Sequence, residues 1–143
     1  MIAKETIEKI FTTDTSGELL VTTAKILAED LKRQDATKTQ IRNIFTELRI
    51  VETKWDSGQA DGNQVAIRRL NLLRPKIAYQ VKRLEKEFHG KVEKSPLKPL
   101  EDFLLPAIDY VNRSNNQINT FKILMNFMEA TLAYHKAIGG SDK

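Results

Sequence analysis

The longest periodic segment of the chain restricts its possible folds more than any other feature. Between about Gln64 and Phe88, the residues of one seam recur at alternating gaps of three and four, the spacing that returns side chains to one face of an α-helix. The seam consists of Ile67, Leu70, Arg74, Ile77, Val81, Leu84 and Phe88. No segment shows a convincing strand-type alternation of apolar and polar residues. The pattern therefore predicts helices packed against helices.

Further helical regions are expected on both sides of this segment. Thr37 and Gln40 form a T-x-x-Q capping box, in which each side chain can satisfy a free N–H group at a helix start. A turn-rich stretch over 12–17 divides the first helical region into two pieces. Gly139 is well placed to cap the last helix. The expected helices cover about 2–11 and 18–32, then 38–55, 64–88, 100–112 and 117–138.

These segments predict an all-α fold, a compact bundle of about five helices. A length of 143 residues fits one domain. We therefore expect a single helical domain over residues 1–143, with 1–16 and 139–143 as flexible ends. Because proline lacks an N–H group and crowds the preceding turn, we expect the third and fourth helices to kink at Pro75 and Pro106.

The composition excludes several classes of protein. Cysteine is absent, which excludes zinc fingers, thiol catalysis and a disulfide scaffold. The apolar runs are only a few residues long, so we expect no membrane span. Residues 1–11 already contain Glu5 and Glu8 and lack the apolar core of a signal peptide. We therefore expect a cytoplasmic protein with no membrane partner.

The positive charge of the chain is concentrated in one window. Lysine and arginine total 23 against 19 acidic residues, a formal net charge of +4. Residues 61–95 hold nine basic and four acidic side chains, net +5, whereas residues 1–34 are net −1 and residues 35–60 and 96–143 are each neutral. Such a patch is typical of a protein that binds a polyanion. A solvated helix face has the same composition, and charge alone favours neither interpretation.

No sequence motif indicates catalysis. Phosphate-binding loops, dinucleotide-binding loops, zinc-protease motifs and nucleophile elbows are all absent. Neither His89 nor His135 has a second ligand at metal-binding spacing, and we interpret His135 as a core histidine. Adjacent acidic residues such as Glu29 and Asp30 point to different sides of a helix and do not converge. We predict a protein that is not an enzyme, with no catalytic residues, no metal and no cofactor.

The basic side chains form a candidate phosphate-binding surface. Arginine and lysine neutralise phosphates and release counterions without reading the base. Tyr79 could stack on a base, although a packed ring with its hydroxyl at the rim is the simpler interpretation. Arg74 stands at an apolar seam position, so we expect it to swing outward, to snorkel, or to be held by an acidic partner or a phosphate. The candidate residues are Arg42, Arg49, Arg68, Arg69, Arg74, Lys76, Tyr79, Lys82 and Arg83.

The last helix is apolar on two faces. One face includes Phe121 and Met128, and the other includes Phe127 and Tyr134. A helix of this kind lies at the centre of a bundle or covers a second partner, and we favour the central position.

Three segments resemble a known family: QIRNIFTELR (40–49), LNLLRPKIAYQVKR (70–83) and FMEATLAYHKAIGG (127–140). Together they resemble the small helical subunit of type III-A CRISPR effector complexes, the Csm complex. The resemblance implies a compact helical bundle without catalytic activity. Several copies would stack along the complex and contact the RNA backbone in antiviral defence. The basic residues inside the matched segments would make these contacts: Arg42, Arg49, Arg74, Lys76, Lys82 and Arg83. Arg68 and Arg69 remain candidates on charge alone.

The resemblance also implies the partners of the chain. They are guide (CRISPR) RNA, target RNA, the backbone and large subunits of the Csm complex, and further copies of the chain itself. The alternative is a helical scaffold within a multi-subunit complex that makes little direct RNA contact. A stand-alone DNA-binding bundle and a nuclease are weaker hypotheses, because neither a helix-turn-helix spacing nor a set of converging acids occurs.

Overall fold

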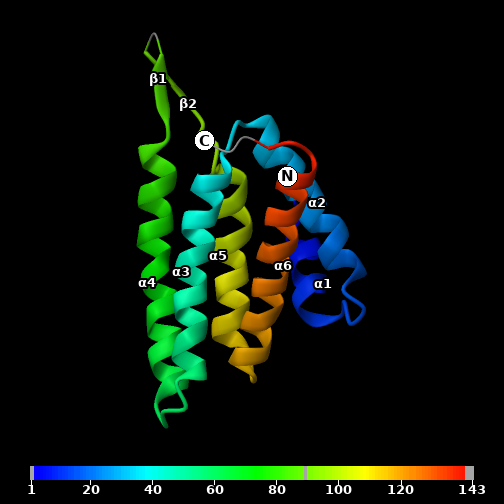
Figure 1. Ribbon diagram of the computed structural model, residues 1–143, viewed down its shortest axis with the longest axis vertical. Helices are drawn as coiled ribbons and strands as arrows, with labels where there is room; N and C mark the ends of the chain where they lie inside the picture. The colour runs from blue at the N-terminus through cyan, green and yellow to red at the C-terminus, as the bar shows by residue number, and fades with distance from the viewer. Residues whose placement is uncertain (1, 89, 141–143) are drawn as a thin grey trace.

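The computed structural model of the protein describes residues 2–88 and 90–140, and of these the side chains of 86–88, 91 and 92 are not described. Six helices and one two-stranded hairpin follow one another along this part of the chain (Figure 1). The predicted all-α bundle is confirmed, and the hairpin is a short addition to it. The elements are α1 (Lys4–Thr12), α2 (Glu18–Arg33), α3 (Lys38–Asp56), α4 (Gly62–Arg83), β1 (Lys86–Phe88), β2 (Lys91–Glu93), α5 (Lys98–Arg113) and α6 (Gln117–Ala137).

Helix α6 lies at the centre of the bundle. It contacts α1, α2, α3 and α5, and its residues Phe121, Phe127 and Met128 are completely buried. Four of the chain's own helices therefore surround α6, which confirms the central position, although Ile123 and Tyr134 of its second apolar face remain partly exposed. In Figure 1, α1 and α2 form one edge of the bundle and α4 forms the opposite edge. Helix α4 packs mainly against α3 and α5, so its outer side is uncovered.

Helix α3 begins at the predicted capping box. The Thr37 hydroxyl accepts a hydrogen bond from the Gln40 N–H at 3.2 Å, and the Gln40 side-chain oxygen accepts one from the Thr37 N–H at 2.9 Å. Along the inner face, Ile41, Ile44 and Leu48 are buried. The cap and this apolar face together fix where α3 starts and which side faces the core.

Helix α4 buries Leu70, Ile77 and Val81 of the predicted seam, but Ala66 and Leu73 are buried in place of Ile67 and Arg74. Leu73 is 2% exposed, while the neighbouring Arg74 lies beside an acidic partner. One residue along a helix turns the side chain by roughly 100°, so Leu73 continues the core face that includes Ile77. Helix α4 continues through Pro75 and α5 continues through Pro106, so neither helix is split. The kinks at these prolines stay predictions.

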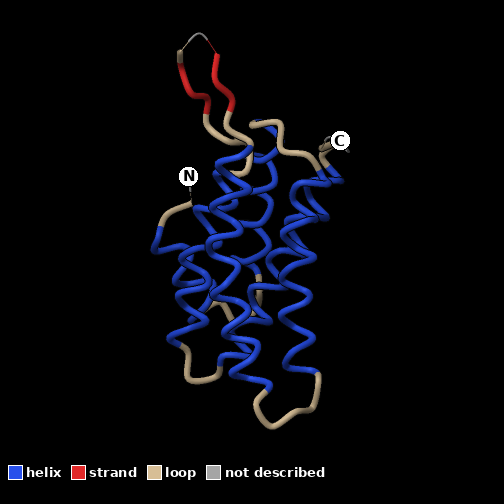
Figure 2. The backbone as a smooth tube through the Cα atoms, turned by 90° about the vertical axis from the view of Figure 1, so that its left-hand side faces the viewer, coloured by secondary structure: helices blue, strands red, loops and turns tan. Residues whose placement is uncertain are grey.

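The chain departs from the predicted helices where α4 ends. The prediction of a helix up to Phe88 followed by a linker is wrong, because α4 ends at Arg83 and residues 86–88 pair antiparallel with residues 91–93. Gly90 adopts a φ of 78°, a left-handed conformation that favours glycine in a tight turn. The hairpin projects beyond the end of the bundle (Figure 2). The period of apolar residues indicates packing against a core. It therefore gives no signal for a hairpin that is held together by pairing between its own two strands.

His135 is a core histidine, as predicted. It is fully buried, and its Nε2 donates to the carbonyl oxygen of Ala36 at 3.0 Å, since a carbonyl can only accept. Gly140 lies against the imidazole ring, and a Cβ atom at this position would fall 2.2 Å from a ring carbon. The closing G-G of the third matched segment therefore has a packing role. Of the end expected to be flexible, residues 141–143 lie outside the described residues.

Candidate nucleic-acid interface

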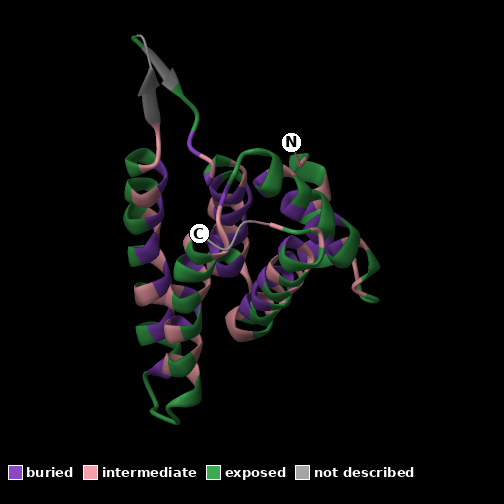
Figure 3. Ribbon diagram, turned by 45° about the horizontal axis from the view of Figure 1, so that its top comes forward, coloured by how far each residue is buried: buried purple, intermediate pink, exposed green. Residues whose placement is uncertain are grey.

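The nine candidate residues lie on two neighbouring helices but not on one surface. Arg42 and Arg49 belong to α3, and the other seven belong to α4. Figure 3 shows exposed residues along the outer edge of α4. The ion-pair partners show where the side chains point. Arg49 faces α6, Arg74 faces α5, and Arg69 and Lys76 face the groove between α3 and α4.

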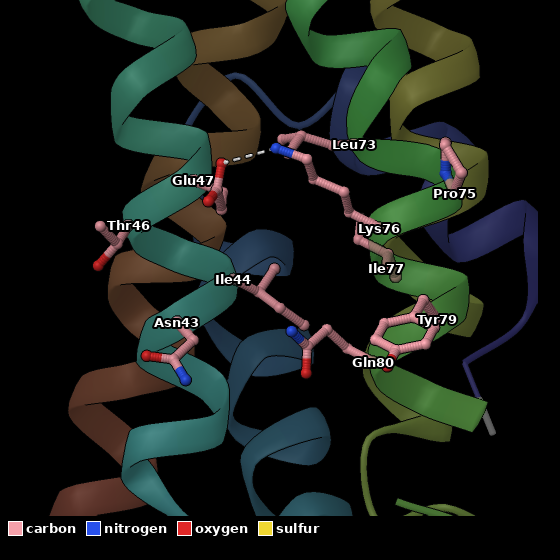
Figure 4. A pocket seen from close by; sticks show the side chains of 10 residues that line it. All are labelled: Asn43, Ile44, Thr46, Glu47, Leu73, Pro75, Lys76, Ile77, Tyr79 and Gln80. Carbon is pink, nitrogen blue, oxygen red and sulfur yellow. Dashed lines mark ion pairs between the residues drawn. The ribbon is translucent and has the colours of Figure 1, made fainter. Parts of the chain in front are cut away.

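A groove of about 600 Å³ runs between α3 and α4. Its deepest residues are the buried apolar Ile44, Leu73 and Ile77, whereas its rim is polar. In Figure 4, Lys76 reaches across the groove from α4 toward the carboxylate of Glu47 on α3. The groove therefore combines an apolar floor with charges of both signs. The lining residues are Asn43, Ile44, Thr46, Glu47, Leu73, Pro75, Lys76, Ile77, Tyr79 and Gln80.

Glu47 is the centre of charge in this groove. Its Oε2 atom lies 3.8 Å from Nη2 of Arg69 and 3.8 Å from Nζ of Lys76. Both are ion-pair distances that exceed the length of a hydrogen bond, and Oε2 accepts no hydrogen bond from the residues that the structure describes. One carboxylate thus partly neutralises two candidate cations and holds neither tightly.

Arg49 points away from the groove, toward α6. Its guanidinium pairs with Glu52 at 2.9 Å and with Glu129 of α6 at 2.6 Å, and it lies over the Phe45 ring at 4.9 Å from the centroid. The hydrogen bond to Glu52 is the main cause of a pKa raised above the ordinary value for arginine, and the charge of Glu129 adds to it. Two carboxylates therefore balance the charge of Arg49 within the chain.

Arg74 faces α5. Its Nη2 forms an ion pair with Asp109, and its Nε donates to the side-chain oxygen of Asn71 at 3.3 Å. Asn71 and Asn112 exchange side-chain hydrogen bonds of 3.0 and 2.8 Å beside this pair. Of the interpretations open for Arg74, the structure shows the acidic partner. The side chain couples α4 to α5 through a polar contact.

The last turn of α4 carries two cations with local partners. Lys82 Nζ forms an ion pair with Oε1 of Glu85 at 2.7 Å, and this contact raises the pKa of the Lys82 ammonium group. Arg83 donates to the side-chain oxygen of Gln80 at 2.8 Å. The Lys82 side chain is 77% exposed, so a ligand can reach it without moving another element.

Arg42, Arg68 and Tyr79 have no ion-pair or hydrogen-bond partner within the described part of the chain. All three are exposed, and Tyr79 is 65% exposed. The interpretation of Tyr79 as a packed ring is therefore wrong. These three side chains are open to a ligand with no internal contact to displace.

Two features of the surface formed by α3 and α4 (the α3–α4 face) were not predicted from the sequence. Glu47 was not predicted, because the period of α3 does not show which of its flanks faces a neighbouring helix. The second feature is an apolar stripe on the outer side of α4. It consists of Val65, Leu72 and Tyr79, which are 39%, 58% and 65% exposed. Seven residues make nearly two helical turns, so this spacing outside the buried seam was a readable signal.

The described residues limit the chemistry of the face. They include no group of three or more histidine, aspartate or glutamate side chains arranged to hold a metal ion. Within the same described ranges, none of the helices has the length and apolar character needed to cross a membrane. The polar groups of the face are cations, side-chain amides and one carboxylate, and they lie beside the apolar stripe.

A comparison with protein families gives a match over most of the chain. The family model described as Csm2 Type III-A matches residues 14–141. The matched range contains α2 to α6 and therefore both helices that carry the candidate residues. Searches of curated proteins and of solved structures found no match.

Proposed function

The chain belongs to the Csm2 family of the type III-A Csm complex, a family of small CRISPR-complex subunits, and we propose that it holds RNA there by the phosphate backbone. The contacts come from basic side chains of α3 and α4. The partners are guide RNA, target RNA, the backbone and large subunits, and further copies of the chain, in the cytoplasm.

The observation that supports this function is a cationic excess on an uncovered helix. Residues 61–95 carry a net charge of +5, and α4 within this window leaves its outer side to solvent. Arg68 on that helix has no carboxylate partner among the described residues, and Arg69 and Lys76 share one carboxylate at 3.8 Å. Phosphates approach such cations at hydrogen-bond distance and release their condensed counterions.

Binding of this kind does not depend on base sequence. Pairing between guide and target reads the sequence, while the protein contacts phosphates and sugars. Each copy makes a few weak contacts, and several copies along one RNA raise the overall affinity through avidity. The chain contributes no bond-breaking step and holds the target for other subunits of the complex.

Neutralising the groove side of α4 tests this function. The triple variant Arg69→Gln, Lys76→Gln and Arg83→Gln removes three positive charges from side chains at the surface. We expect weaker binding of single-stranded RNA. The slope of log affinity against log salt should become shallower by about 0.7 for each phosphate that the variant no longer binds. Filter binding across a salt series measures both quantities.

A matched control removes the same charge from the opposite edge. Lys4, Lys9 and Lys25 are exposed on α1 and α2, and their replacement by glutamine leaves the α3–α4 face intact. Circular dichroism checks that both triple variants keep their helices. Equally weakened RNA binding in the two variants would show that net charge alone binds RNA, and would contradict the assignment to α4.

A second candidate function, a helical scaffold, is favoured by the apolar stripe of Val65, Leu72 and Tyr79. Exposed apolar side chains at heptad spacing are the surface on which a second helix packs. Arg68 and Lys82 lie on the same side of α4, so charge complementarity favours an amphipathic helix with acidic flanks from another subunit. On α6, Phe127 is completely buried and Tyr134 is only partly exposed, so this face offers less apolar surface than the stripe on α4.

The substitution Leu72→Lys separates the two functions. It places a charge in the stripe, changes no residue of the core and adds to the cationic surface. A scaffold function predicts loss of assembly with the other subunits and unchanged or stronger RNA binding by the free chain. Normal assembly of this variant would rule out the stripe as a docking surface.

A further inference from the structure

We propose that Glu47 sets the strength with which the α3–α4 face binds RNA, because it competes with phosphate for Arg69 and Lys76. This inference rests on the proposed function, since it concerns the same cations. In the free protein Glu47 is the counter-charge of both side chains. In the bound protein the phosphates of the strand take its place.

The geometry makes Glu47 a partner that phosphate can replace. The two cations approach the same carboxylate oxygen from different turns of α4, and each remains 3.8 Å away. The side chains of Arg69 and Lys76 are 37% and 59% exposed, so a strand can reach both cations, whereas the Oε2 atom of Glu47 is buried beneath them. A phosphate oxygen can approach a guanidinium to about 2.7–2.9 Å, closer than Glu47 does.

The same carboxylate also opposes the strand. A phosphate bound between Arg69 and Lys76 lies beside a carboxylate of the same sign, and like charges close together raise the free energy of the bound state. When its cations leave, Glu47 must recruit a counterion from solution. Glu47 therefore weakens binding by a single copy and reduces the net number of ions that binding releases. Firm retention of RNA then depends on several copies along the strand.

Replacing Glu47 by glutamine tests the proposal, since Glu47→Gln keeps the shape of the side chain and removes its charge. We expect the dissociation constant for a twelve-nucleotide oligouridine to fall about three- to tenfold at low salt, and the log–log salt slope to steepen by up to about 0.7. The matched control is Glu29→Gln on α2, an exposed residue at the other edge of the bundle. It makes the same change in net charge, and its effect should stay below twofold.

A double-mutant cycle assigns the effect to the named cations. In a chain that already carries Arg69→Gln and Lys76→Gln, the gain from Glu47→Gln should disappear, because no cation remains for Glu47 to occupy. A gain that persists in this background overturns the proposal. Thermal unfolding of each variant confirms that the bundle is intact.

The opposite substitution keeps the proposal testable if Glu47→Gln does not fold. Gln80 lines the same groove and accepts a hydrogen bond from Arg83, so Gln80→Glu adds a carboxylate of the same shape. We expect RNA affinity to fall at least threefold, and an unchanged affinity overturns the proposal.

The experiment separates this inference from the proposed function. If the unmodified chain binds RNA and Glu47→Gln behaves like Glu29→Gln, Glu47 is no competitor, while RNA binding by the chain stands. If neither the unmodified chain nor Glu47→Gln binds RNA, both the inference and the proposed function are overturned.

Discussion

The two edges of the bundle perform the same packing task but differ in charge. At one edge α2 packs against α6, and at the other α4 packs against α3, each with its outer side exposed. Residues 1–34 are nevertheless net −1, whereas residues 61–95 are net +5. Packing constrains only the inner seam of each helix. Packing therefore does not account for the charge of the α4 edge, whereas the proposed binding of RNA does.

The ion pairs of the two edges differ in the same way. On α2, Arg33 pairs with Asp30 one turn away, and Lys32 donates to the carbonyl oxygen of Ile138 at 2.6 Å, which satisfies the end of α6. At the α4 edge, Arg69 and Lys76 share one carboxylate without a hydrogen bond. Lys32 thus completes a helix end at one edge, whereas Arg69 and Lys76 at the other edge are held only loosely by their carboxylate.

The largest expected effect comes from truncating one buried leucine at each edge, which tests whether the two edges are packed equally well. Leu27 of α2 is 1% exposed and Leu70 of α4 is fully buried. Leu27→Ala and Leu70→Ala should each lower the free energy of unfolding by about 2–5 kcal/mol, because apolar burial is removed and a cavity is left behind. Urea unfolding followed by circular dichroism measures both. A decrease below about 1 kcal/mol at one edge would mean that this edge is not packed like the other.

The capping residues at the starts of α2 and α3 provide a smaller test of whether the two sides of the bundle are equally stable. Asp14 accepts hydrogen bonds from the N–H groups of Leu19 and Leu20 at the start of α2, and Thr37 caps α3. Asp14→Ala and Thr37→Ala should each cost about 1 kcal/mol of unfolding free energy. Thermal or urea unfolding detects a change of this size. RNA binding should change for neither variant while the helices remain folded, and a selective loss for Thr37→Ala would link the cap to the binding face.

Much of the fold was predictable because it is encoded locally. The capping box at Thr37, the turn-rich stretch over 12–17 and the apolar period gave the helices and most of their ends. The hairpin was missed because strand pairing holds it beyond the core, where the apolar period carries no information. Leu73 takes the seam position that was predicted for Arg74. The apolar period allows either residue at this point of the helix, and only the position of α5 with Asp109 decides between them.

The candidate site was predictable only as a set of charges. Each arginine could be placed on a helix, but its partner lies on another helix in several cases, as with Glu129 for Arg49 and Asp109 for Arg74. Glu47 could not be recognised, because its role comes from two side chains of the next helix. Positive charge in a sequence therefore shows how many cations a face has, and the structure shows which of them are already neutralised.

Single neutralisations on α4 sharpen this distinction between open and paired cations. Arg68 has no ion-pair or hydrogen-bond partner among the described residues, whereas Lys82 forms an ion pair with Glu85 at 2.7 Å. We expect Arg68→Gln to lower the affinity for single-stranded RNA about threefold. In free energy this is about half of the loss that a tenfold change in affinity represents. Lys82→Gln should have a smaller effect, because Glu85 already neutralises this ammonium group in the free chain. Lys25→Gln on α2 serves as the control, and an effect of Lys82→Gln as large as that of Arg68→Gln would contradict the ranking.

The smallest expected effect concerns pH and contrasts an ion pair in the bundle with one on the α4 edge. The pKa values of Lys98 and Lys82 are both raised, mainly by hydrogen bonds to Glu101 and Glu85. A raised pKa in the folded state means that each pair contributes stability below about pH 10.4, the unfolded value, and loses it as the pH rises through the folded pKa. The unfolding free energy of Lys98→Gln should thus approach that of the unmodified chain between about pH 8 and about pH 11.5. The Lys98 and Glu101 side chains are 48% and 10% exposed, against 77% and 27% for Lys82 and Glu85, so the convergence should be larger for Lys98→Gln than for Lys82→Gln. Urea unfolding at the two pH values measures it, and a gap that widens with pH would show that these pairs do not stabilise the folded state.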